Sequence, residues 1–412
     1  PDCPAGVGGM KYLGSIWPKA ATAAACGALV LACVVVARGD DWPGFLGAQR
    51  DGSSVEAGWS VDWQASAPKK LWECQVGQGY SCASISGGRA YTMGHANDAD
   101  TVFCLDAVTG KEVWKKSYPC KSPGYPGPRC SPAIDGDRVY TVSVEGHIKC
   151  WNAADGSEIW SRQASEFGGK ANGWGFAGSP LVLGEKLIVD VGAAAAMDKK
   201  TGKDIWKTPP YKAGYSSPKA FRAGGRDLVA VFGGDELKVL AAGEGTLVAA
   251  TPWKTGYDTN AAVPVISGDE IYVTTSYNHG GAKFKLEGQK LVQVWENKDM
   301  ASQFATPVLV GGYLYGVSGN VNDGPVRCLD FKDGLVKWSA PGSGSLILVD
   351  GKLVILGSKG RLAVAQASPE GYKELGSTDL GTGDWWNAPV LANGLIYCRS
   401  HEGKLICLDV RK

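Results

Sequence analysis

The fold is decided by residues 131–160, which read SPAIDGDRVYTVSVEGHIKCWNAADGSEIW. Short runs of apolar, β-branched and aromatic residues in this stretch are separated by three turn sequences, Asp135-Gly136, Gly146-His147 and Asp155-Gly156. This alternation predicts four short strands joined by tight turns, which together form one antiparallel sheet. We call the four strands a to d in chain order.

The same unit recurs along the chain, and its copies align on a tryptophan in the fourth strand. Consecutive tryptophans of this set are 42 to 47 residues apart, at Trp72, Trp114, Trp160, Trp206, Trp253, Trp295 and Trp338. A four-stranded unit with this period is typical of the blade of a β-propeller, whose sheets pack side by side around an axis. Strand a then lies nearest the axis and strand d is outermost.

Counting inner strands gives the number of blades. Eight of them begin near Ser84, Ser131, Ser179, Ser217, Ala262, Thr306, Ser345 and Ala388. The last unit ends before a fourth strand, whereas residues 70–74 carry the unmatched Trp72 ahead of the first unit. We therefore predict an all-β, eight-bladed β-propeller of four-stranded antiparallel blades, closed into a ring by pairing of the N- and C-terminal segments, which leaves no open sheet edge there.

The seventh unit is the least regular of the eight. It lacks the closing tryptophan, and residues 363–365 read Ala-Val-Ala where other units have Cys-Leu-Asp. It is counted as a blade because residues 350–356, Asp-Gly-Lys-Leu-Val-Ile-Leu, keep the turn and second strand of the repeat. A seven-bladed structure would refute this count.

Residues 1–39 are predicted to be an N-terminal extension and signal peptide, followed by a lead-in segment at 40–68 and the propeller at 69–412. Lys11 and Lys19 precede an uncharged run at 20–37, and the small residues Ala37 and Gly39 fit cleavage after Gly39. Two alternatives stay open, an uncleaved membrane anchor and a lipoprotein signal ending at Cys33. Each of them exports the folded part to the periplasm or cell envelope.

The charge composition argues against two classes of partner. The chain has 42 Lys and Arg residues against 41 Asp and Glu residues, and it contains no Lys- or Arg-rich run. A protein with this balance has no net field to attract nucleic acid or anionic lipid. We expect no nucleic-acid partner, membrane association through the N-terminal segment alone, and a monomer.

Nine cysteines follow the proposed cleavage site, an odd number that cannot all pair. Cys120 and Cys130 bracket a Pro- and Gly-rich loop and are the first candidates for a disulfide, with Cys74 and Cys82 next. Four others occupy one position of the repeat and are predicted to be small buried strand residues: Cys104, Cys150, Cys328 and Cys407.

The units that begin Cys-Leu-Asp, at 104–114, 328–338 and 407–409, resemble the pyrroloquinoline quinone (PQQ) repeat family of bacterial β-propellers. The lead-in sequence Asp-Trp-Pro-Gly-Phe at 41–45 is similar to the start of exported members described only as PQQ-binding-like propellers. The resemblance covers about residues 40–412. It implies the fold and leaves function open, because the family includes both quinone-dependent dehydrogenases and BamB, a non-enzymatic propeller of outer-membrane assembly.

The two faces of the predicted propeller differ in sequence. Turns between strands a and b are short and repetitive, whereas the connections from strand d to the next strand a are irregular and aromatic. Because each of these connections ends at an inner strand, we expect it to lie near the axis. They form the predicted ligand- or partner-binding funnel, with Tyr80, Trp174, Phe176, Tyr215, Tyr257, Asn260, Phe304, Trp386 and Asn387. The alternative is that these rings pack between blades.

All four histidines are assigned to connections between strands b and c, on the same face: His95, His147, His279 and His401. Three of them, His401, His95 and His147, come from the neighbouring blades eight, one and two. Since such loops diverge away from the axis, we expect solvated side chains and predict no metal site.

No catalytic residue is assigned. The sequence contains no GxSxG, HExxH or phosphate-loop motif and no adjacent Cys-Cys pair. Two carboxylate–amide pairs occur at the funnel, Asp258 with Asn260 and Asp384 with Asn387, and we interpret them as loop caps. A non-enzymatic role is therefore favoured over an enzymatic one.

The first functional hypothesis is an exported, non-catalytic binding or assembly scaffold that holds a protein segment or a glycan at the d–a face. The alternative is a PQQ-dependent quinoprotein oxidoreductase of the alcohol or sugar dehydrogenase type, and PQQ and calcium are expected as cofactors only in that case. A carbohydrate-active or other enzyme is the third reading.

Overall fold

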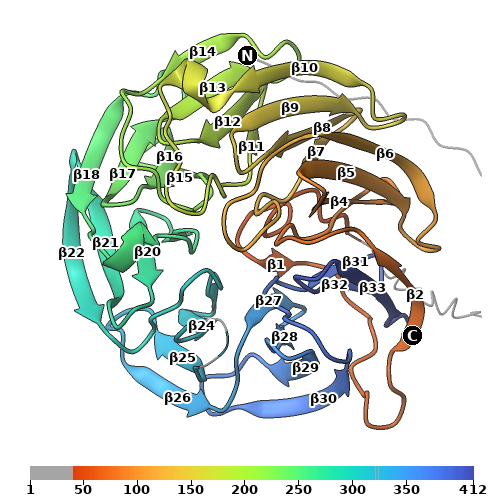
Figure 1. The fold of residues 1–412 in the computed structure, drawn as a ribbon. Coiled ribbons are helices and arrows are strands. Elements are labelled where there is room, and N and C mark those ends of the chain that lie inside the picture. The colour runs from red at the N-terminus through yellow and green to blue at the C-terminus, as the bar shows by residue number, and fades with distance from the viewer. Residues whose placement is uncertain (1–39, 321, 323) are drawn as a thin grey trace, which may run out of the picture. The chain divides into compact units, whose positions relative to one another are not determined.

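The computed structural model describes residues 40–412 except 321 and 323. These residues form eight β-sheets around a central axis, each built on four antiparallel strands, and the short strand β1 (Ser53–Ser54) adds a fifth, parallel strand to the seventh sheet (Figure 1). The predicted eight-bladed β-propeller is confirmed. Two short 3₁₀ helices lie in connections between blades, η1 (Ala164–Phe167) and η2 (Gly256–Asp258). Across the described residues, no helix has both the length and the apolar character that a membrane crossing requires.

Blades one to four follow one another along the chain. Their strands, from the axis outward, are β3 (Ser84–Ser86), β4 (Arg89–Ala96), β5 (Ala99–Asp106) and β6 (Glu112–Pro119); β7 (Ala133–Asp135), β8 (Arg138–Val142), β9 (His147–Asn152) and β10 (Glu158–Gln163); β11 (Leu181–Leu183), β12 (Lys186–Asp190), β13 (Ala194–Asp198) and β14 (Asp204–Lys207); β15 (Lys219–Ala223), β16 (Arg226–Phe232), β17 (Glu236–Ala241) and β18 (Leu247–Pro252).

Blades five to seven continue the same order. Their strands are β19 (Val265–Ser267), β20 (Glu270–Thr275), β21 (Gly280–Glu287) and β22 (Lys290–Asn297); β23 (Val308–Val310), β24 (Tyr313–Val317), β25 (Val326–Asp330) and β26 (Val336–Ala340); β27 (Ser345–Val349), β28 (Lys352–Leu356), β29 (Arg361–Gln366) and β30 (Lys373–Asp379). The irregular seventh unit is therefore a blade, as predicted.

Blade eight closes the ring with strands from both ends of the described chain. Its inner strands are β31 (Val390–Ala392), β32 (Leu395–Arg399) and β33 (Lys404–Asp409), and its outer strand is β2 (Lys69–Gln75). β2 pairs antiparallel with β33 and places Trp72 opposite Cys407. This pairing is the predicted closure.

A row of three side chains crosses the sheet in blades one, two, six and eight. In blade two, Cys150 of β9 lies opposite both Tyr140 of β8 and Trp160 of β10, and the two ring centroids are 6.1 Å apart. The small sulfur fits between the rings, which explains why cysteine recurs there. The other rows are Tyr91, Cys104 and Trp114; Tyr315, Cys328 and Trp338; Tyr397, Cys407 and Trp72. All four cysteines are buried free thiols, as predicted.

The fourth-strand tryptophans join each blade to the next. Trp72 Nε1 donates a hydrogen bond to the carbonyl of Ala107 in the following blade (3.1 Å). The ring also covers Gly110 in the turn between strands c and d of that blade. Trp114, Trp160, Trp206, Trp295 and Trp338 donate to carbonyls of their following blades in the same way. Trp253 is the exception and donates to Thr275 within the next blade's second strand.

Blade seven replaces its missing tryptophan with one from the lead-in segment. Gly376 of its outer strand β30 lies against Trp63, since a Cβ built on Gly376 would be 2.8 Å from Trp63 Cβ. Trp63 is buried, and the neighbouring Ser60 donates its backbone N–H to Val410 O of blade eight (2.6 Å). The lead-in thus covers the joint between the last two blades.

Candidate ligand-binding site

The lead-in segment enters the propeller at the face formed by the a–b turns. The Asp41 carboxylate accepts hydrogen bonds from Gly87 N and Ser86 Oγ in the first such turn. Glu56 accepts from the backbone N–H groups of Asn393 and Gly394 in the last one. Both ends of residues 41–56 are therefore fixed to the same face.

Between these ends, the segment crosses the central channel. Trp42 exchanges backbone hydrogen bonds with Ile85, and β1 (Ser53–Ser54) pairs parallel with the inner strand β27 (Figure 1). The Arg50 guanidinium donates to the carbonyls of Ser179 and Pro180 (3.1 and 2.8 Å). These contacts join the segment to the inner strands of opposite blades and close the channel.

A buried lysine also fixes the crossing segment. Lys219 Nζ donates to the carbonyls of Gln49 (2.5 Å) and Arg50 (2.9 Å). Burial lowers the pKa of Lys219 to about 8 and that of Arg50 to about 10. Both cations use backbone carbonyls as hydrogen-bond partners, which offsets part of the cost of removing them from water.

Above the crossing segment, a cavity of about 280 Å³ opens toward the d–a face. Phe45 and Leu46 form its floor, and seven of the eight d–a connections contribute to its wall, whereas in blade seven Ser345 and Leu346 of β27 line it. Six of the nine residues predicted for the funnel line it: Tyr80, Trp174, Tyr215, Phe304, Trp386 and Asn387.

Three predicted funnel residues lie elsewhere. Phe176 is packed between blades against Gly146, as the alternative interpretation expected. Tyr257 is 72% exposed and does not line the cavity itself, although its ring packs against that of the lining residue Tyr277, with centroids 5.3 Å apart. Asn260 is fully buried, and its amide donates to the carbonyls of Gly233 and Trp253. Asn260 therefore holds the loop in place and is not part of the cavity wall.

Sequence reasoning missed several lining residues. Tyr125 and Arg129 belong to the Pro- and Gly-rich loop that was interpreted as a disulfide loop, and Gln303 directly precedes Phe304. Tyr277 comes from a b–c turn of blade five, and Phe45 from the lead-in. The two loop residues share the irregular d–a position of the others, a feature that could have identified them.

One wall of the cavity is a cluster of aromatic rings from the junction of blades eight and one. Tyr80 stacks on Trp386 and on His401, with centroids 5.5 and 4.6 Å apart. The Arg129 guanidinium lies 5.3 Å from the Tyr80 centroid, within the range of a cation–π contact. Burial lowers the pKa of His401, so its ring is neutral at pH 7.

Polar atoms of this wall have no hydrogen-bond partner among the described residues. Both Nδ2 and Oδ1 of Asn387 are buried and unpaired, and so is the Tyr80 hydroxyl. Burial raises the pKa of Tyr80 to about 12, so the hydroxyl keeps its proton. Buried donors and acceptors normally have partners, and the two residues that carry these three groups line the cavity.

Hydroxyl groups around the inner strands connect neighbouring blades. Ser131, Ser179, Ser217 and Thr306 each accept a hydrogen bond from a backbone N–H of the preceding blade. In these four cases the next residue is proline, so a Ser-Pro or Thr-Pro pair marks where an inner strand begins. Ser179, Ser217 and Thr306 also line the cavity.

Neither funnel carboxylate lines the cavity. Asp258 pairs with Lys212 and Asp384 pairs with Lys359, each at 2.7 Å. The described residues that line the cavity include no Asp or Glu. The polar groups available to a ligand are hydroxyls, two amides and the guanidinium of Arg129.

The predicted disulfide between Cys120 and Cys130 is wrong, since both residues are free thiols, as are Cys74 and Cys82. Cys130 Sγ accepts a hydrogen bond from the backbone N–H of Val142 in β8, the second strand of blade two (3.3 Å). Cys120 instead lies at the end of β6, beside Glu145 and His147. The loop between them holds the two sulfurs in different environments.

The histidine prediction is also corrected in part. His95 lies inside β4, is buried, and pairs with Asp100 through Nδ1 (2.8 Å). His147 begins β9, whereas His279 and His401 lie in turns between strands b and c. His279 packs edge-on to Trp253, with centroids 4.5 Å apart. These rings contact protein side chains and are not simply solvated.

Eight four-stranded blades, a channel closed by the lead-in and an aromatic cavity at the d–a face define a PQQ-repeat β-propeller with a floor. A family model described as "Outer membrane protein assembly factor BamB" matches residues 49–129 and 121–340. The chain belongs to this family.

Individual relatives are more distant. A quinoprotein ethanol dehydrogenase of Pseudomonas putida is 29% identical over 156 residues, which are 33% of this chain and 24% of the relative. The chain thus spans a minor part of the length of that enzyme.

Two solved structures share the fold over most of the chain. BamB from Moraxella catarrhalis superposes with a TM-score of 0.62 at 15% identity, covering 83% of this chain and 97% of that one. Quinohemoprotein alcohol dehydrogenase ADHIIG from Pseudomonas putida HK5 gives 0.63 at 13% identity, covering 90% and 80%. Identities this low show the fold alone.

Proposed function

We propose that this protein is an exported, non-catalytic binding scaffold of the cell envelope, and that its cavity holds a segment of a protein partner. The observation that carries this proposal is the unpaired amide of Asn387 in the aromatic wall. An Asn side chain presents one donor group and one acceptor side by side, which matches the C=O and N–H of a peptide group.

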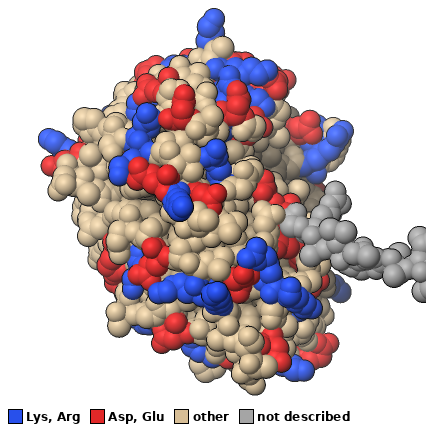
Figure 2. Space-filling model, turned by 90° about the vertical axis from the view of Figure 1, so that its right-hand side faces the viewer, with Lys and Arg blue, Asp and Glu red and all other residues tan. Residues whose placement is uncertain are grey.

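The rest of the cavity suits an uncharged segment. Trp386, Tyr80, Phe304 and Phe45 offer apolar area to side chains of the segment. Arg129 is the one charged side chain among the described residues that line the cavity. On the outer rim of the ring, which Figure 2 shows, positive and negative side chains are intermixed. Recognition would then depend on stacking and hydrogen bonds.

The cell-envelope location rests on two arguments of different kinds. The family description names outer-membrane protein assembly. The hydrophobic run at 20–37 supports export, although the proposed signal and its alternatives at Gly39 and Cys33 lie outside the described residues.

The quinoprotein function is the second candidate, because dehydrogenases of that class are among the relatives. Calcium is bound by several oxygen ligands, carboxylates foremost, and alcohol oxidation needs a base near the reacting carbon. The described residues lining the cavity supply neither a carboxylate nor an unpaired carboxyl base. The cavity therefore does not fit calcium-bound PQQ.

The test is a binding comparison of the full-length protein against three probes: a library of uncharged, aromatic-containing peptides, an oligosaccharide array, and PQQ with and without calcium. We expect saturable peptide binding that weakens about tenfold or more in Asn387→Ala, which removes both amide groups. Asn152→Ala is the matched control, since Asn152 lies in β9 of blade two and does not line the cavity.

Each other outcome has a defined meaning. Binding of oligosaccharides alone would replace the protein partner by a glycan. Calcium-dependent binding of PQQ, followed by a rise in Tm, would overturn the proposal in favour of a quinoprotein. Peptide binding that is equally strong in Asn387→Ala would refute the role of the cavity.

A further inference from the structure

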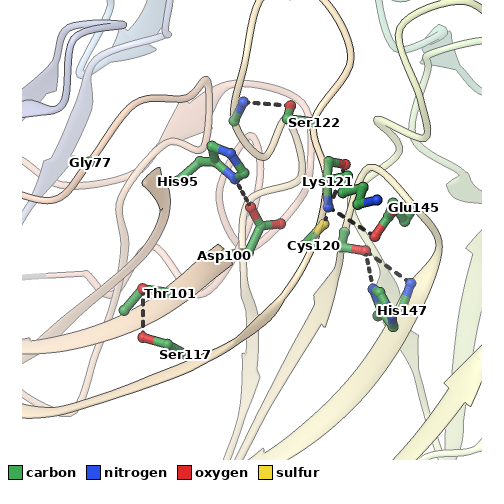
Figure 3. Close-up of polar contacts among 12 residues, drawn as sticks. Gly77, His95, Asp100, Thr101, Ser117, Cys120, Lys121, Ser122, Glu145 and His147 are labelled. Carbon is green, nitrogen blue, oxygen red and sulfur yellow. Dashed lines mark hydrogen bonds and ion pairs between the residues drawn. The ribbon is translucent and has the colours of Figure 1, made fainter. Parts of the chain in front are cut away.

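A second cluster of chemically active side chains lies between blades one and two, apart from the residues that line the cavity. Cys120 follows β6, Glu145 lies in the turn between β8 and β9, and His147 begins β9. The thiol, one carboxylate oxygen and one ring nitrogen all lie within 4.8 Å of one another (Figure 3).

A buried carboxylate faces this cluster from β5. Asp100 is fully buried, and its Oδ1 accepts a hydrogen bond from His95 Nδ1 (2.8 Å). The other oxygen, Oδ2, is buried without any partner among the described residues. In Figure 3 the Asp100 carboxylate lies between His95 and Cys120. An unpaired carboxylate oxygen in this place is costly unless a cation completes it.

The surroundings hold the four side chains in position. Ser143 Oγ is 2.9 Å from His147 Nδ1, and Glu145 accepts the backbone N–H of Lys121 through Oε2 (3.0 Å). His95 orients Asp100 in the same manner as outer groups orient the ligands of metal sites. Cys120 and Asp100 are buried, whereas His147 is half-buried and Glu145 is exposed, so an ion can enter from solvent.

This donor set has a clear chemical preference. One thiolate, one imidazole and carboxylate oxygens are the ligands of zinc and neighbouring transition metals, whereas calcium and magnesium bind through oxygen alone. Burial and the nearby Asp100 raise the pKa of the Cys120 thiol to about 12, and burial lowers that of His147. The imidazole is therefore neutral and able to bind, and the thiol would release its proton to solvent as the metal–sulfur bond forms.

We propose that Cys120, His147 and Glu145 form a binding site for a zinc-type divalent metal ion that joins blade one to blade two, with the unpaired carboxylate oxygen of Asp100 beside it. The ligands come from both blades, so the ion would hold the two sheets together beside the loop at 120–130. That loop carries Tyr125 and Arg129 into the cavity.

The test uses cobalt(II) and zinc(II) titrations of the full-length, reduced protein. We expect one equivalent of cobalt to produce the near-ultraviolet absorption of a thiolate–cobalt bond, zinc to displace it, and zinc to raise Tm. Cys120→Ser should abolish the absorption, and His147→Gln and Glu145→Gln should weaken affinity tenfold or more. Cys74→Ser and His279→Gln are matched controls that should bind as the wild type does.

Three outcomes would overturn the proposal: no thiolate–cobalt absorption in the wild type, an absorption that persists in Cys120→Ser, or unchanged affinity in Glu145→Gln together with His147→Gln. The Glu145→Gln variant keeps the test decisive if Cys120→Ser does not fold, because Glu145 is exposed and its amide analogue still accepts the Lys121 N–H.

Discussion

At the scale of single residues, two glycines of similar backbone conformation have different structural roles. Gly110, in a c–d turn, has a φ of +68°, and a Cβ built on it would lie 2.5 Å from the Trp72 ring. Gly136, in an a–b turn, has a φ of +57°, and a Cβ there would meet nothing within 4 Å. Both positions favour glycine for backbone reasons, but only Gly110 is also required by packing between blades.

We therefore expect Gly110→Ala to lower the free energy of unfolding by about 2 to 4 kcal/mol, the sum of a left-handed backbone and an overpacked contact. Gly136→Ala should cost about 1 kcal/mol, from the backbone alone. Denaturant unfolding of both variants measures the difference, and equal losses would contradict the packing argument.

At the scale of elements, the lead-in segment completes two parts of the ring. Residues 41–56 close the channel through Arg50 and Lys219, and Trp63 covers the outer strand of blade seven. The tryptophan of blade seven is therefore supplied from a segment more than three hundred residues away in sequence, which explains how that unit remains a blade without one of its own.

Replacing Trp63 tests whether the lead-in stabilises the outer strand of blade seven. Trp63→Ala should lower the free energy of unfolding by about 3 to 5 kcal/mol, as expected for a buried ring removed from a packed joint. Trp174→Ala is the matched control, because Trp174 is partly exposed at the cavity, and it should cost much less. Denaturant midpoints give both values. A small loss in Trp63→Ala would mean that blade seven is stable without the lead-in.

The strands could be predicted because each copy of the repeat carries the same turn sequences between short runs of apolar residues. Four-strand periodicity, the inner-strand starts and the unmatched Trp72 led to eight blades and their closure. The path of residues 40–68 could not be predicted, since Arg50 and Lys219 bond to carbonyls, which leave no trace in a pattern of side chains. For the same reason, Asn260 and Asn387 look alike in sequence, although one is satisfied by carbonyls and the other is unpaired.

At the scale of the whole molecule, the repeated cysteines give the propeller a shared response to pH. Burial raises the pKa of Cys150 to about 12, of Cys328 to about 11 and of Cys407 to about 12. An unfolded thiol titrates near pH 8.5. Between these values the folded state holds protons that the unfolded state has lost, so the stabilisation is complete below about pH 8.5 and is lost as pH rises.

We expect the free energy of unfolding to fall between about pH 9 and 11, by about 1.4 kcal/mol per pH unit for each such thiol. Cys150→Ala should reduce this slope by the contribution of one thiol, about 1.4 kcal/mol per pH unit. Ser157→Ala, which changes an exposed side chain in the same blade, should leave the slope unaltered. Denaturant unfolding under reducing conditions at several pH values measures the slope. Identical slopes in Cys150→Ala and the wild type would contradict the assignment.

The floor made by Phe45 and Leu46 also decides how any occupant can move. A propeller with an open central channel would let a polymer pass from one face to the other. In this protein the lead-in closes the channel, so the cavity opens toward the d–a face. Whatever enters must leave by the same way, so an internal stretch of a taut chain cannot reach the bottom, but a chain end or the tip of a hairpin can. Two ligands therefore compete for the same cavity, and one must leave before the other can bind.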